Sequence, residues 1–140
     1  MIPAPDVQRA RPQLLVWWVL WGSILAGLGV CYFFLGRGHP VAQVVSPDKL
    51  LISLVGLVPL FISIVIRWLV LPRSHQMGAA LVMFIIGLVL AEACAFLGLF
   101  LGGPYRDDLF LLGVLGVVQY VPFFARVYLE PKSRGFIPNN

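Results

Sequence analysis

Four long apolar runs, separated by short polar segments, make up most of the 140-residue sequence. The runs cover residues 14–35, 50–71, 77–101 and 109–129. An α-helix rises about 1.5 Å per residue, so roughly 20 residues cross the ~30 Å hydrocarbon core of a bilayer. Each run is long enough for one crossing. The sequence therefore predicts an all-α polytopic membrane protein, with four transmembrane helices in a single membrane domain over residues 1–140.

The composition agrees with a membrane protein and argues against a nucleic-acid-binding one. Hydrophobic residues make up 60% of the chain and charged residues 11%, whereas soluble domains contain about 25% charged residues. The net charge is +4, but the basic residues are spread around the ends of the runs and form no stripe of their own. We therefore expect the lipid bilayer, and no nucleic acid, as a partner.

The distribution of lysine and arginine predicts which side of the membrane the termini occupy. Four crossings place both termini on one side, and cytoplasmic segments carry the excess of basic residues. The side of the termini holds Arg9, Arg11, Arg67, Arg73, Arg126, Lys132 and Arg134, and the other side holds Arg37, Lys49 and Arg106. This difference predicts that both termini are cytoplasmic.

The chain lacks the sequence patterns of common catalytic and metal sites. It contains no Cys-x-x-Cys or His-x-x-x-His pair, and its two histidines lie in segments on opposite sides of the membrane. Phosphate-binding loops and nucleophile elbows are also missing from the sequence. The sequence thus predicts a protein that is not an enzyme, with no catalytic residues, no cofactor and no metal site.

One acidic residue, Glu92, lies just past the middle of the third run. A charged carboxylate at the centre of a bilayer costs at least about 2.5 kcal/mol, so we expect Glu92 to face other helices. Three groups at similar predicted depth are candidate partners: Gln119, Ser23 and the Val55 carbonyl, which Pro59 leaves without its helical donor. The carboxyl group could hold the bundle together, carry a proton or cation together with Gln119, or bind a partner helix.

Small residues follow the same run at regular spacing. Gly87, Ala91 and Ala95 are four residues apart, and Gly98 prolongs the pattern. Small side chains at this spacing let two helix backbones approach closely. This face favours a helix-packing or assembly role, with a second copy of the chain or another membrane protein as partner. The alternative function is a proton- or cation-coupled component that uses Glu92.

The segment 87–99 resembles the carboxylate-bearing helix of the c subunits of rotary ATP synthases. The resemblance implies that Glu92 carries a proton or a sodium ion. The preceding run contains only Gly56 and also Pro59, whereas the family's first helix is lined with glycines, so the resemblance is confined to one helix. The chain also resembles small bacterial four-helix membrane proteins with an Ala-Glu-Ala motif, which implies the bacterial cytoplasmic (inner) membrane.

Overall fold

A computed structural model describes residues 5–36, 47–74, 76–101 and 103–128 of the protein. Within these ranges the chain is almost entirely helical and forms no β-strand. The four α-helices are α1 (Pro5–Cys31), α2 (Pro47–Val65), α3 (Met77–Leu101) and α4 (Arg106–Val118). Five short helical segments extend or join them: the π-helical η1 (Tyr32–Gly36) and η2 (Ile66–Val70), and the 3₁₀-helical η3 (Leu71–Arg73), η4 (Gly103–Tyr105) and η5 (Pro122–Tyr128).

The described helices include four segments that are long and apolar enough to cross a membrane. These segments are Leu14–Gly36, Leu54–Arg73, Met77–Leu101 and Gly103–Ala125. The prediction of an all-α chain with four candidate transmembrane helices is therefore confirmed at the level of helix length and composition.

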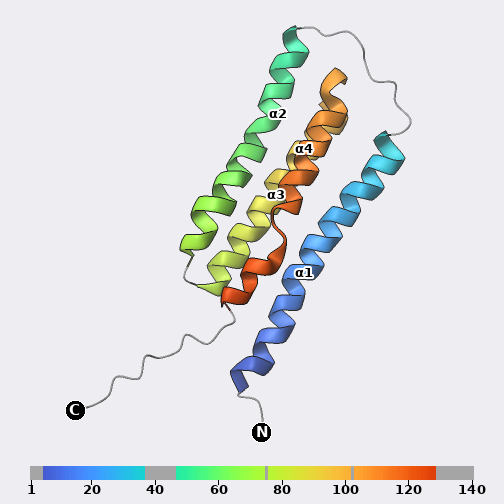
Figure 1. The fold of residues 1–140 in the computed structure, drawn as a ribbon. Coiled ribbons are helices and arrows are strands. Elements are labelled where there is room, and N and C mark those ends of the chain that lie inside the picture. Colours follow the sequence, from blue (N-terminus) through green and yellow to red (C-terminus); the bar gives the residue numbers. More distant parts are fainter. Residues whose placement is uncertain (1–4, 37–46, 75, 102, 129–140) are drawn as a thin grey trace, which may run out of the picture.

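The helices form an antiparallel bundle in which α3 packs against both α2 and α4, and α2 also contacts α4 (Figure 1). The start of α1, the α2–α3 connection and η5 lie at one end of the bundle, and the α3–α4 connection lies at the other. Helix α1 packs on α3, α4 and η5 and is the most peripheral of the four. In the most apolar window of its span 11% of the residues are buried, against 39% for the spans of α3 and α4.

Close packing of α3 on α4 depends on glycines that have no space for a side chain. A Cβ atom built on Gly113 would lie 2.5 Å from the Ala95 backbone nitrogen. Gly98 is equally close to Leu109, and Gly116 lies against Ala91. In a pair of antiparallel helices, a step forward along one helix meets a step back along the other. The three contacts follow this pattern, so they define a single register of α3 against α4.

The helix boundaries differ from the predicted runs at two prolines. The predicted fourth helix, 109–129, begins earlier, at Arg106, and α4 ends at Val118, before Pro122. Proline has no N–H and its ring clashes with the carbonyl four residues earlier, which disfavours continuation of the α-helix at Pro122. The predicted second helix, 50–71, begins at Pro47, and α2 continues through Pro59 to Val65 before it changes to π-helical and 3₁₀ geometry.

The other two predicted helices agree more closely with the structure. The third predicted helix, 77–101, coincides with α3. The first, 14–35, corresponds to the candidate membrane span Leu14–Gly36 of α1 and η1, but α1 itself begins at Pro5.

Candidate functional site

Glu92 lies on α3 at the edge of its buried face. Leu88 and Ala95, one turn away on either side, are completely buried. Glu92 itself is half-buried, while Val89 is 50% exposed and Phe100 is 65% exposed. Residues three and four apart on a helix share a face. The carboxyl group therefore lies between the packed interior of the bundle and the outer surface of α3.

The sequence predicts Gln119 as a hydrogen-bond partner of Glu92, but no hydrogen bond connects the two side chains in the structure. No hydrogen bond or ion pair connects the Glu92 carboxyl group with any other described residue. The contacts of Gly116 with Ala91 and of Tyr120 with Gly87 place Gln119 level with Leu88. Glu92 is four residues further along α3, which corresponds to about 6 Å along the helix axis. The two predicted partners therefore lie at different depths.

The other two predicted partners of Glu92 also point elsewhere. The Ser23 hydroxyl is exposed and donates to the Leu20 carbonyl within its own helix, at 3.0 Å. Helix α2 contacts α3 near Cys94, which is buried in a cluster with Leu60. Two residues turn an α-helix by about 200°, so Cys94 and Glu92 lie on nearly opposite sides of α3. The α2 backbone around Pro59 is therefore on the wrong side of α3 to accept a bond from Glu92.

A second polar region lies where α4 ends inside its span. A continuous helix would pair the N–H groups of residues 122 and 123 with the carbonyls of Val118 and Gln119. Pro122 has no N–H. Instead, the Val121 N–H donates to the Val118 carbonyl at 3.1 Å, and the Phe123 N–H donates to the Val121 carbonyl at 2.8 Å. The tighter turn leaves the Gln119 carbonyl without a main-chain donor.

Side chains from two other helices donate to carbonyls at this break. Arg67 Nε, from η2, donates to the Gln119 carbonyl at 2.9 Å, and the Arg67 guanidinium lies over the Phe124 ring, 4.3 Å from its centroid. Trp21 Nε1, from α1, donates to the Val117 carbonyl at 2.9 Å. The C-terminal end of a helix carries a partial negative charge, so the Arg67 cation also stabilises α4 electrostatically.

A buried hydrogen-bond network links α2 and α3 with Tyr120, which lies between the end of α4 and Pro122. Tyr120 Oη donates to the Ser63 carbonyl at 2.6 Å, and Ser63 Oγ donates to the Gly87 carbonyl at 2.8 Å. Ser63 and Tyr120 are both completely buried. A Cβ atom on Gly87 would collide with the Tyr120 hydroxyl, so only glycine leaves room for this contact.

The residues that the sequence predicts as a site are not gathered around Glu92 in the structure. Gly87 lies against Tyr120, while Ala91, Ala95 and Gly98 lie against α4. These four residues are buried inside the chain, so the small-residue face is covered by α4 and Tyr120 and is closed to another molecule. The Gln119 carbonyl binds Arg67, and the buried Gln119 Nε2 has no hydrogen-bond partner among the described residues.

Arg67, Ser63 and Tyr120 were not identified as interacting residues from the sequence. Arg67 was counted only as a cytoplasmic positive charge, although it lies within the apolar span Leu54–Arg73. The available signal was a charged residue inside an apolar run together with a proline at similar depth in another run. A proline that interrupts a helix leaves nearby main-chain carbonyls without donors, and a cation can bind one of them.

We expect Tyr120→Phe to lower the free energy of unfolding by about 1 kcal/mol, because hydrogen bonds between membrane helices contribute about 0.6–1.7 kcal/mol. Unfolding can be followed by circular dichroism while SDS is titrated into mild-detergent micelles. Tyr32→Phe is the matched control, since the Tyr32 ring stacks on Phe110 and its hydroxyl bonds to no described residue. Equal effects of the two substitutions would contradict a stabilising role for the Tyr120 hydroxyl.

Comparisons of the chain with protein-family models, with curated proteins and with solved structures find no match. Its function must therefore be argued from the geometry of its own residues.

Proposed function

We propose that the protein is a non-enzymatic component of a membrane assembly and binds a partner transmembrane helix beside Glu92. The observation that carries the proposal is the Glu92 carboxyl group, which lies within the span Met77–Leu101 and bonds to no described residue. An ionisable side chain at this depth is costly unless another group pairs with it. A partner helix would supply that group.

The binding surface in this proposal is the outer side of α3. We define the Glu92 face as Ile85, Val89, Glu92, Phe96 and Phe100, which project from one side of the helix. Its apolar members are compatible with either lipid or protein. Lipid tails offer no hydrogen-bonding group, whereas a partner helix can, so the carboxyl group favours a protein at this face.

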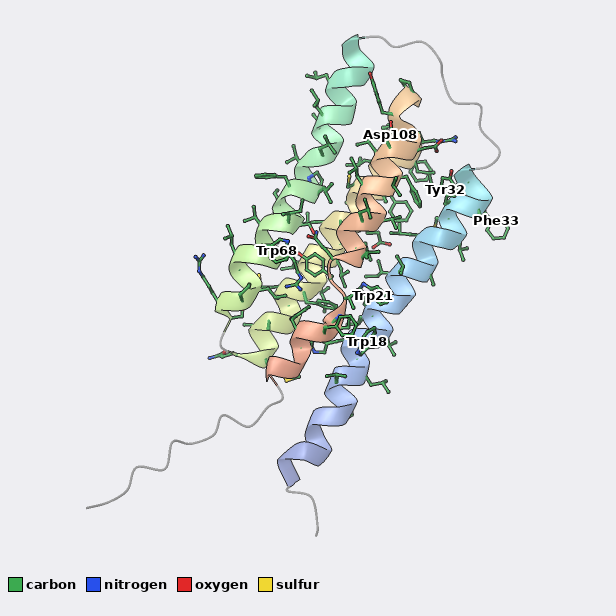
Figure 2. All side chains as sticks on the ribbon, in the orientation of Figure 1. Trp18, Trp21, Tyr32, Phe33, Trp68 and Asp108 are labelled. Atoms are coloured by element: carbon green, nitrogen blue, oxygen red, sulfur yellow. The ribbon has the colours of Figure 1, made fainter. Side chains whose placement is uncertain are left out.

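We propose the cytoplasmic (inner) membrane of a bacterium as the location, with both termini cytoplasmic. Trp18, Trp21 and Trp68 lie in the half of the bundle where α1 begins, whereas Tyr32, Phe33 and Asp108 lie in the opposite half (Figure 2). Tryptophan is enriched at membrane interfaces, and cytoplasmic segments are rich in lysine and arginine. Apart from Arg67, which lies within the span Leu54–Arg73, six basic residues are assigned to the side of the termini and three to the other side.

Site-specific photo-crosslinking in native membranes tests the proposed binding face. A photo-reactive phenylalanine derivative replaces Val89, which is 50% exposed on the Glu92 face. The same derivative at Phe61, 68% exposed on α2, is the control. We expect a protein adduct from position 89 and none from position 61, because only the former lies beside Glu92. Adducts of equal yield from both positions, or from neither, would contradict the proposal.

A second candidate function is proton or cation coupling through Glu92. The half-buried position of Glu92 favours it, because an ion carrier must exchange with its surroundings. Two Glu92 substitutions in the same crosslinking assay distinguish the assembly role from the coupling role.

Glu92→Gln keeps the hydrogen-bonding groups of the side chain but cannot ionise, while Glu92→Leu can neither form hydrogen bonds nor ionise. For an assembly role the position-89 adduct persists in Glu92→Gln and is lost in Glu92→Leu. For a coupling role, Glu92→Gln abolishes a pH-gradient or membrane-potential response while the adduct is unaffected by either substitution.

A further inference from the structure

We infer that the partner at the Glu92 face is a second copy of this chain, and that the two Glu92 carboxyl groups bond to each other. The inference rests on the proposed function and specifies its partner. The resulting assembly is a two-fold symmetric dimer in which α3 of one protomer packs along α3 of the other.

Depth in the membrane is the first argument for a second copy. A partner of Glu92 must present a polar group at the depth of Glu92, within an otherwise apolar span. Two copies with the same orientation are related by a two-fold axis along the membrane normal, and such an axis leaves depth unchanged. Every residue of one protomer therefore meets the other protomer at its own depth. A second copy in the same orientation therefore presents its own Glu92 at the depth of the first Glu92.

The chemistry of the carboxyl group is the second argument. A protonated carboxylic acid has one O–H donor and a carbonyl oxygen that accepts, so it is complementary to itself. Two such groups related by a two-fold axis form two hydrogen bonds and leave no donor unpaired. Within its own chain, Glu92 has no described hydrogen-bond or ion-pair partner that would compete with this pairing.

The surroundings of Glu92 also permit two copies of α3 to approach each other. Ile85, Val89 and Phe100 are 38%, 50% and 65% exposed, so most of the Glu92 face is open. Glu92 and Phe96 are half-buried, and Phe96 also packs against the main hydrophobic core of its own chain. Phe96 stacks on Phe100, with ring centroids 6.3 Å apart, which gives the face one ordered aromatic pair. The same surface on both protomers makes a closed interface, so the assembly stops at two copies.

Cysteine crosslinking with two differently tagged copies tests the inference. Both copies carry Val89→Cys in a background in which Cys31 and Cys94 are replaced by alanine, and a short thiol-specific crosslinker is added to native membranes. We expect a dimer that carries both tags. The dimer should persist in Glu92→Gln, since primary amides also pair with each other, and should fall by about tenfold in Glu92→Leu. Phe61→Cys replaces Val89→Cys in the control and should give no dimer.

The outcomes separate the inference from the proposed function. A Glu92-dependent adduct that contains a different protein, and no dimer with both tags, overturns the second copy and leaves the proposed assembly role intact. If neither a dimer with both tags nor an adduct with a different protein forms, both the inference and the proposed function are overturned. A two-tag dimer that is equally abundant in wild type and Glu92→Leu overturns the carboxyl pair. Circular dichroism of each purified variant shows that loss of crosslinking does not come from unfolding.

Discussion

Replacing Gly113 with alanine is expected to lower the free energy of unfolding by about 2–3 kcal/mol, because overpacking a tight interface costs roughly this amount. The new Cβ atom would lie 2.5 Å from the Ala95 backbone nitrogen and 2.6 Å from the Ala95 Cβ atom. Both atoms belong to the backbone or are bonded directly to it, so no side-chain rotation can relieve the contact. Helices α3 and α4 must separate, and separation weakens the neighbouring contacts of Gly98 and Gly116 as well.

Gly29→Ala is the matched control for Gly113→Ala. Gly29 is also a helical glycine, in α1, but a Cβ atom there would meet no atom within 4 Å. Alanine is favoured over glycine in a helix by about 1 kcal/mol, so this substitution should be neutral or stabilising. SDS titration in mixed micelles measures both variants. If Gly113→Ala were as stable as Gly29→Ala, the described α3–α4 packing distance would be wrong.

The presence of four long apolar helical segments could be predicted from the sequence, because a run of apolar residues is a local property. Each crossing needs about 20 apolar residues in a row, and this property can be counted without knowledge of the neighbouring helices. The predicted third helix, 77–101, coincides with α3 for this reason.

The partners of Glu92 could not be predicted because they depend on the rotation and register of the helices. A shift of one residue turns a side chain by about 100°, and four residues change its depth by about 6 Å. Helix α3 is apolar on all sides, so hydrophobicity does not show which side faces the bundle. Equal depth of Glu92 and Gln119 was inferred from the middle of each run, whereas the glycine contacts set a register in which the two differ.

The two central prolines show why the break in α4 was also beyond local prediction. Both Pro59 and Pro122 remove one main-chain donor from an apolar run. Helix α2 continues through Pro59, whereas α4 ends before Pro122. At Pro122 a freed carbonyl finds a donor on another helix, Arg67, which is 52 positions away from Gln119 in the sequence. The sequence locates the prolines, and the tertiary fold decides whether a helix bends or ends there.

Arg67→Leu is expected to lower the free energy of unfolding by about 2 kcal/mol. The substitution leaves the Gln119 carbonyl without a donor in an apolar environment, which costs about 1–3 kcal/mol. It also removes the contact between the guanidinium and the Phe124 ring, which lie 4.3 Å apart. Relief of the cost of burying a cation offsets part of both losses. Arg73→Leu is the control, because Arg73 is exposed at the end of η3 and its loss should change stability by less than about 0.5 kcal/mol.

A double substitution tests whether Arg67 stabilises the protein through the break in α4. Pro122→Ala supplies the missing N–H, so the helix can continue and the Phe123 N–H can pair with the Gln119 carbonyl. That carbonyl then no longer needs Arg67. The destabilisation caused by Arg67→Leu should therefore fall to about half or less in the Pro122→Ala background. An unchanged cost of Arg67→Leu would mean that the arginine acts through its ring contacts and its charge. A reduced cost would show that Arg67 and Pro122 form one structural unit, in which the cation donates to the Gln119 carbonyl that the break at the proline leaves without the Phe123 N–H.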